Sequence, residues 1–155
     1  MRIPRLVPGI GGLLTGIVIF LVCLVAAYKS TPPGEYTFEP RGPGSFELRL
    51  GNYARLVEII IGLATGSIVL LAGSSIFRSG GRLPWFYGSP LVLLAMSVIY
   101  ALTFLALLVR AYENFLHNEK FYTRAAYTIN VSLGFASLIC FALGYLWLGF
   151  ALANG

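Results

Sequence analysis

The sequence predicts an all-α membrane protein, in which a single domain of residues 1–155 forms a bundle of four transmembrane helices. The composition is strongly apolar, with 57% hydrophobic residues and a mean hydropathy of +0.81. Charged residues make up 11% of the chain, against about a quarter of an ordinary soluble domain. Four separate apolar stretches also approach or exceed about 20 residues, the helix length that crosses a hydrocarbon core. These observations exclude a soluble globule and a disordered chain.

The four predicted helices cover about residues 9–28, 56–77, 91–117 and 124–153. None of the apolar runs carries a charge near its centre. Because no water reaches the hydrocarbon core to satisfy the backbone, each run must be helical there. The third helix continues past its apolar part, residues 91–109, and the fourth is long enough to tilt or to project from the membrane.

The loop of residues 29–54 is the one connection large enough to hold structure of its own. Apolar and polar residues alternate in 36–39 and again in 46–50, on either side of the turn-rich segment 40–44. This pattern predicts a small β-hairpin, although a loop with chance alternation is the alternative. The apolar face of the hairpin would carry Tyr36, Phe38, Phe46, Leu48 and Leu50. A lone hairpin is only marginally stable, so this face would need support from helix ends, headgroups or another chain.

The charged residues gather on the side of the first and third connections. That side holds all six glutamates and seven of the eleven basic residues, namely Lys29, Arg41, Arg49, Arg55, Arg110, Lys120 and Arg124. Counting basic residues makes this side cytoplasmic, whereas Arg2 and Arg5 before the first helix argue the reverse, so the orientation stays open. The basic residues stand singly between apolar runs, as at membrane flanks, so no nucleic-acid partner is expected.

Small residues at helical spacing predict where the helices pack, because membrane helices associate by close approach of their backbones. The predicted packing residues lie in the first, second and fourth helices. They are Gly12, Gly16, Gly62, Gly66, Gly73, Gly134, Ser137 and Gly144.

Glu58 is the most informative single residue, because it lies about one turn into the second predicted helix and on its glycine stripe. Asn130 enters the fourth predicted helix from the same side, so the two residues could lie at similar depth. Together with Arg55, Arg110 and Arg124 they form a candidate polar cluster. An ionisable residue in a span is a functional hypothesis, and a ligand, ion or proton site is one interpretation. A structural ion pair between Glu58 and Arg55 is the other.

The sequence offers no catalytic, cofactor-binding or metal-ligating set. No His or Lys lies within a span, so haem, chlorophyll and retinal lack their common protein ligands, and no CxxC or phosphate-binding glycine motif occurs. Glu113 and His117 share a helical face, but a metal needs three or four ligands and the chain has a single His. No cofactor is expected.

These features favour a structural or accessory subunit of a membrane assembly, with the lipid bilayer and either other membrane subunits or further copies of itself as partners. An integral, multi-pass position in the cell or inner membrane is expected. An oligomeric pore or membrane effector is an alternative, since several hydroxyl residues could line a narrow path. These are Thr15, Thr65, Ser67, Ser74, Ser97, Thr103 and Ser137.

The second alternative is an enzyme. Chain length, span count and the polar residues Arg49, Asn52, Arg55 and Glu58 resemble the membrane-associated eicosanoid and glutathione metabolism family. That resemblance implies trimers of four-helix subunits, with Arg, Asn and Glu at the start of the second helix facing the active site. Asn52 and Glu58 are farther apart than the family pattern requires. The Arg and Tyr signature of the family's third helix has no counterpart here.

Overall fold

The described part of the protein folds into four long helices, as the sequence predicts. A computed structural model describes residues 7–33, 46–73, 87–118 and 123–153. The helices are α1 (Val7–Ser30), α2 (Phe46–Gly73), α4 (Gly88–Asn118) and α5 (Arg124–Ala153). Each contains a segment long and apolar enough to cross a membrane, which is compatible with a multi-pass integral membrane protein.

The ends of the helices follow from local chemistry. At the end of α1, both the backbone N–H and the hydroxyl of Thr31 donate to the carbonyl of Ala27, and Pro32 and Pro33 follow. Proline cannot continue the backbone ladder, so the helix stops there. Thr123 caps the start of α5, since its hydroxyl accepts a hydrogen bond from the N–H of Ala126 at 3.3 Å. In α4, Pro90 lies in the first turn, where a missing N–H costs nothing.

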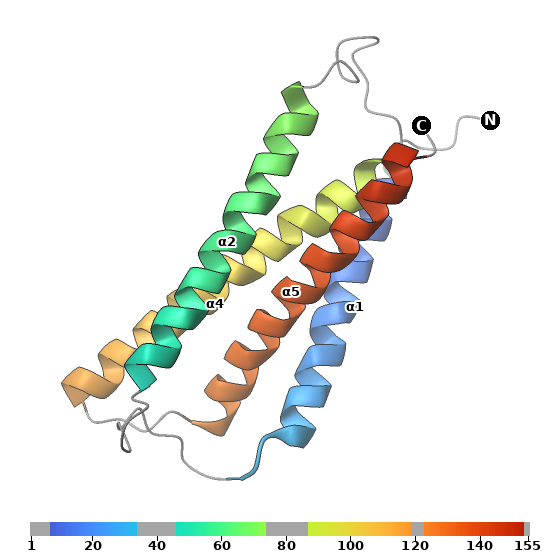
Figure 1. Cartoon of the computed structure of the whole chain (residues 1–155). Coiled ribbons are helices and arrows are strands. Elements are labelled where there is room, and N and C mark those ends of the chain that lie inside the picture. The colour runs from blue at the N-terminus through green and yellow to red at the C-terminus, as the bar shows by residue number, and fades with distance from the viewer. Residues whose placement is uncertain (1–6, 34–45, 74–86, 119–122, 154–155) are drawn as a thin grey trace.

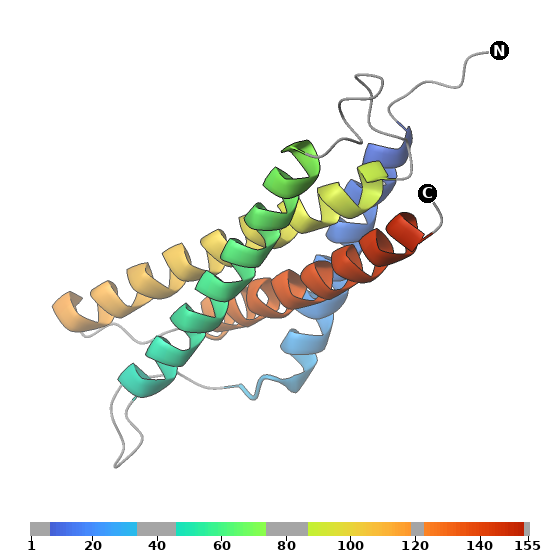
Figure 2. The ribbon, with the colours of Figure 1, turned by 45° about the horizontal axis from the view of Figure 1, so that its top comes forward.

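Consecutive helices run in opposite directions, and α4 and α5 form the central pair (Figure 1). Helix α1 packs against both of them, whereas α2 packs mainly against α4 and meets α5 over a small area. Figure 2 shows that α2 and α1 lie on different sides of the α4–α5 pair. The end of α1, the start of α2, the end of α4 and the start of α5 therefore share one end of the bundle. We call this the charged end, because Lys29, Arg55, Arg110 and Arg124 lie toward it.

Two buried clusters join α2 to the central pair. The cluster nearer the charged end contains Val57, Ala101, Phe104, Leu108 and Leu133. The second lies toward the opposite end and contains Ala64, Leu71, Tyr87, Leu94, Leu148 and Ala151. Each cluster takes residues from three helices, so both are interhelical contacts rather than a single central core.

The prediction of a β-hairpin is wrong in its second strand, because α2 begins at Phe46 and residues 46–50 are helical. Phe46, Leu50, Tyr53 and Val57 recur at helical spacing, and this longer period outweighs five residues of alternation. A helix also satisfies its own backbone hydrogen bonds without a partner strand. The predicted first strand and turn, residues 36–44, lie outside the described residues.

The early start of α2 also corrects the predicted place of Glu58. It lies 12 residues after Phe46, more than three turns into α2 rather than about one. The added turns contact the bundle through Tyr53, whose ring meets that of Phe104 edge-on with centroids 6.2 Å apart.

Candidate functional site

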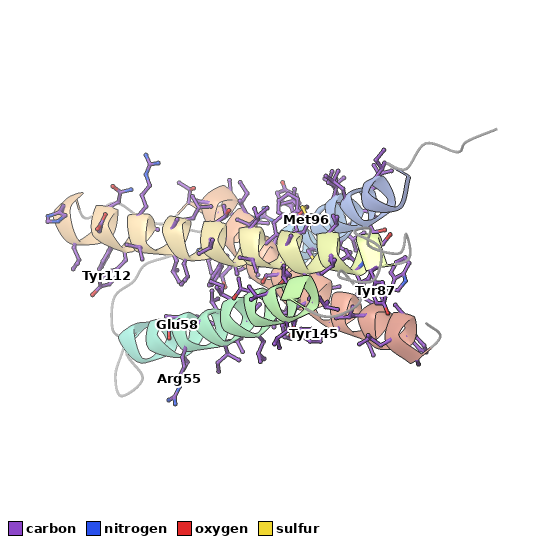
Figure 3. The ribbon with its side chains drawn as sticks, turned by 90° about the horizontal axis from the view of Figure 1, so that it is seen from above. Arg55, Glu58, Tyr87, Met96, Tyr112 and Tyr145 are labelled. Atoms are coloured by element: carbon purple, nitrogen blue, oxygen red, sulfur yellow. The ribbon has the colours of Figure 1, made fainter. Side chains whose placement is uncertain are left out.

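The contact between α1 and α4 is built on two of the predicted packing glycines. A Cβ added at Gly12 would lie 2.7 Å from the carbonyl oxygen of Ser89, and one added at Gly16 would lie 3.2 Å from Cε of Met96. Met96 is labelled in Figure 3. Tyr100 extends this contact by donating to the carbonyl of Gly16 at 3.1 Å and stacking on Phe20, with centroids 5.6 Å apart. Only glycine lets the two helices approach this closely.

The contact between α4 and α5 contains the predicted packing residues of α5. A Cβ added at Gly134 would lie 3.4 Å from the ring of Phe104, and one added at Gly144 would lie 3.0 Å from Leu94. Ser137 is buried against Ser97, and each hydroxyl donates to the other residue's carbonyl, at 2.9 Å from Ser97 and 3.0 Å from Ser137. This seam combines close packing with polar bonds across the helices.

Tyr145 of α5 adds hydrogen bonds to the apolar contacts between α2 and α5. Tyr145, labelled in Figure 3, donates to the carbonyl of Leu63 at 2.8 Å, and its hydroxyl also contacts the hydroxyl of Ser67. The sequence singled out Ser67 as a hydroxyl residue but did not indicate this contact, because a tyrosine inside an apolar run has no periodic signal.

The hydroxyl residues proposed to line a path bond instead within the bundle. Thr15, Thr65 and Thr103 each donate to a carbonyl one turn earlier in their own helix. Ser97, Ser137 and Ser67 make the interhelical contacts given above. Ser74 lies outside the described residues.

The five residues of the candidate polar cluster do not come together. Among these described residues, no hydrogen bond or ion pair joins any two of them. Arg124 turns to the end of α1, where its Nη2 donates to the carbonyl of Tyr28 at 2.9 Å and its guanidinium lies 4.6 Å from the centroid of that ring. Asn130 is buried, whereas Arg55, Glu58 and Arg110 are exposed on α2 and α4.

Two buried polar atoms have no hydrogen-bond partner among the described residues, namely Nε of Arg124 and Oδ1 of Asn130. The whole Asn130 side chain is only 3% exposed. A buried polar group without a partner destabilises a fold, so this amide is an unfavourable feature of the α5 contact.

The glycines of α2 share one face, which we call the outer stripe: Arg55, Glu58, Gly62, Gly66, Val69 and Gly73. At about 100° per residue, these six positions fall within a sector about 80° wide. All six are exposed, and a Cβ added at any of the three glycines would meet nothing within 4 Å. The buried residues Val57, Ile60, Ala64 and Leu71 occupy the opposite face. The predicted packing glycines of α2 therefore do not face the rest of this chain.

Arg55 and Glu58 stand three residues apart on the outer stripe without contacting each other. The ion pair between Glu58 and Arg55, one of the two interpretations of the sequence, is thus not formed in the structure. Figure 3 shows Arg55 projecting from the side of α2 that is turned away from α4. Asn52 is also exposed, so Asn52, Arg55 and Glu58, three of the residues that carry the resemblance to the enzyme family, do not line an internal site.

Glu113 and His117 are both exposed near the end of α4, and no group of three metal-ligating side chains exists in the part of the chain that the structure describes. The described residues form four helices, each of which has the length and apolar composition of a membrane span. No protein-family model, curated protein or solved structure matches the chain.

Proposed function

We propose that this protein is a structural or accessory subunit of a membrane assembly, and that its work is contact with other membrane-embedded chains. The observation that carries the proposal is the open space over Gly62, Gly66 and Gly73. Gly62 and Gly66 lie in the interior of α2, where each glycine costs about 1 kcal/mol of helix stability relative to alanine, and neither makes a close contact within the chain. Lipid chains pack against larger side chains equally well, so contact with lipid does not require glycine at these positions. A second helix, in contrast, can approach the backbone of α2 closely only where the side chains are small.

The rest of the bundle supports a role in contact. Ser97, Ser137, Tyr100 and Tyr145 make hydrogen bonds that hold the helices together. The charged side chains of the described ranges lie toward one end or on the outer surface. This distribution suits a part that presents surfaces to neighbours.

The test is the mass of the protein extracted in polymer-bounded lipid discs, in which native contacts survive. We expect a particle that contains more protein than one 16.8-kDa chain, whether as further copies or as other polypeptides. Gly62→Ile with Gly66→Ile should reduce that mass to one chain, because the added side chains hold a neighbour away. Gly149→Ile is the matched control, since Gly149 is exposed on α5 with nothing within 4 Å of an added Cβ. A single chain for the unaltered protein would overturn the proposal.

A further inference from the structure

We infer that the occupant of the outer stripe is a second copy of this chain, packed α2 against α2 in parallel about a two-fold axis along the membrane normal. This inference rests on the proposed function and names the partner. Two independent features of the stripe carry it, one steric and one electrostatic.

The steric feature is the spacing of the glycines. Gly62 and Gly66 are four residues apart and Gly73 lies two turns further on, so the glycines give a flat strip along the second half of the candidate span Gly51–Leu71 and just beyond it. Val69, which lies between Gly66 and Gly73, is 69% exposed and can pack against Val69 of the second copy across the two-fold axis. Two copies inserted in the same orientation bring these glycines to the same depth, so one flat strip meets another.

The electrostatic feature is the pair of opposite charges at the start of the strip. Glu58 lies within the candidate span, on the outside of the bundle, and has no ion-pair partner among the described residues. Ionisable residues in a span normally pair with another group rather than face lipid. Within the stripe, Arg55 is the available cation, and it too has no ion-pair partner in the described ranges.

A two-fold axis makes this pair self-complementary. In such an interface, if residue i contacts residue j of the other copy, then j also contacts i. Arg55 of each copy thereby reaches Glu58 of the other, and two interchain pairs form from one Arg and one Glu per chain. The planar guanidinium suits such a carboxylate contact. A dissimilar partner would need a complementary acid and base of its own at the same depth, whereas a second copy has both.

Disulfide cross-linking tests the contact directly. The buried native thiols Cys23 and Cys140 are replaced with alanine, and Val69→Cys is introduced. The purified protein is reconstituted at low density in phosphatidylcholine vesicles and oxidised. We expect covalent dimers at Val69→Cys and about tenfold fewer at Leu146→Cys, a control site on α5 that is 61% exposed. Equal cross-linking at the two sites, or none at Val69→Cys, overturns the inference.

A charge exchange tests the pairing without altering any cysteine. Glu58→Arg gives a copy with two bases on the stripe, and Arg55→Glu gives a copy with two acids. Each variant alone should self-associate about tenfold more weakly than the natural chain, which corresponds to about 1.4 kcal/mol. When differently tagged copies of the two variants are mixed, they should co-purify with each other and recover the association. An ion pair confined to one helix predicts no such recovery, and its absence would contradict the interchain pairing.

The outcomes separate this inference from the proposed function. A disc that contains the chain with other polypeptides, and no Val69→Cys dimer, overturns the second copy and leaves the subunit proposal standing. A single chain in the discs together with no cross-link overturns both. If the double variant Gly62→Ile, Gly66→Ile still forms a dimer, the interface lies away from the outer stripe, and the inference is also overturned.

Discussion

Ser97 and Ser137 exchange hydrogen bonds across the α4–α5 seam, each hydroxyl donating to the other residue's backbone carbonyl, at 2.9 Å and 3.0 Å. Both side chains are fully or almost fully buried. The two hydroxyl oxygens are also 3.4 Å apart, so the four polar atoms form a closed group in the middle of the most extensive helix contact.

Removing either hydroxyl should weaken this seam measurably. Ser97→Ala or Ser137→Ala is expected to lower the free energy of unfolding by about 0.6 kcal/mol, the average for interhelical hydrogen bonds in a membrane protein. Unfolding by denaturing detergent in mixed micelles measures the change. Thr103→Ala is the control, because Thr103 is exposed and bonds to Ile99 of its own helix. An effect as large in that control would show that the seam has no special role.

Adding one methyl group at Gly12 should destabilise the fold. The new Cβ would lie 2.7 Å from the backbone oxygen of Ser89, so α1 and α4 must move apart. We expect Gly12→Ala to cost about 1–3 kcal/mol, the usual range for forced overpacking. Gly9→Ala on the same helix meets nothing within 4 Å and should stabilise the helix by about 0.5–1 kcal/mol. Thermal unfolding in detergent compares the two, and equal melting temperatures would contradict the close contact.

Tyr145→Phe should loosen α2 more than the rest of the bundle. The substitution removes the hydrogen bond to the carbonyl of Leu63 but keeps the ring beside Phe141, with centroids 4.7 Å apart. Because α2 meets α5 over a small area, we expect amide hydrogen exchange to rise in α2 around residues 63–67 and to stay unchanged in α1. A uniform rise over all helices would mean that the bond serves the whole fold rather than the attachment of α2.

Arg124→Lys should weaken the link between the start of α5 and the end of α1. Lysine keeps the positive charge but loses the planar guanidinium that donates to the carbonyl of Tyr28 and covers its ring. A cation–π contact at a partly exposed site contributes about 0.5–1 kcal/mol, so we expect a loss of that size. Tyr28→Leu should reduce the difference between Arg and Lys at position 124, and a double-mutant cycle of unfolding free energies measures this coupling.

Asn130→Ala is expected to leave stability unchanged or to raise it. The amide oxygen is buried without a hydrogen-bond partner in the described ranges, so its removal relieves a polar group that gains nothing from burial. The midpoint of unfolding in denaturing detergent measures the effect. A loss of more than about 1 kcal/mol would show that the amide is engaged in the membrane-embedded protein, for instance by a bound ligand.

The four helices were predictable from the sequence because the length and polarity of each apolar run decide its structure in a membrane. The third and fourth helices end close to the predicted residues, at Asn118 and Ala153. The start of α2 was missed because residues 46–50 satisfy a two-residue and a helical period at once. Only the continuation through Tyr53 and Val57, which contact the bundle, distinguishes the two.

The contacts were less predictable, because a glycine marks a face on which a helix can approach without saying what approaches it. The same signal at Gly12 and at Gly62 corresponds to a tight intrachain contact in one case and to open space in the other. The polar cluster failed for a related reason. The sequence places Glu58 and Asn130 toward the same end of the bundle, but it does not show which way each helix faces. In the structure Glu58 faces outward and Asn130 faces inward.

The place of α2 on a different side of the central pair from α1 has a consequence for biosynthesis. The ribosome delivers α1 and α2 first, yet the extensive contacts of α1 are with α4 and α5, and those of α2 are with α4. Helices α1 and α2 can therefore make these contacts only after α4 and α5 have been synthesised. Before that point the strip of glycines on α2 is already complete, so the α2–α2 pairing that we infer would be able to form before each bundle closes.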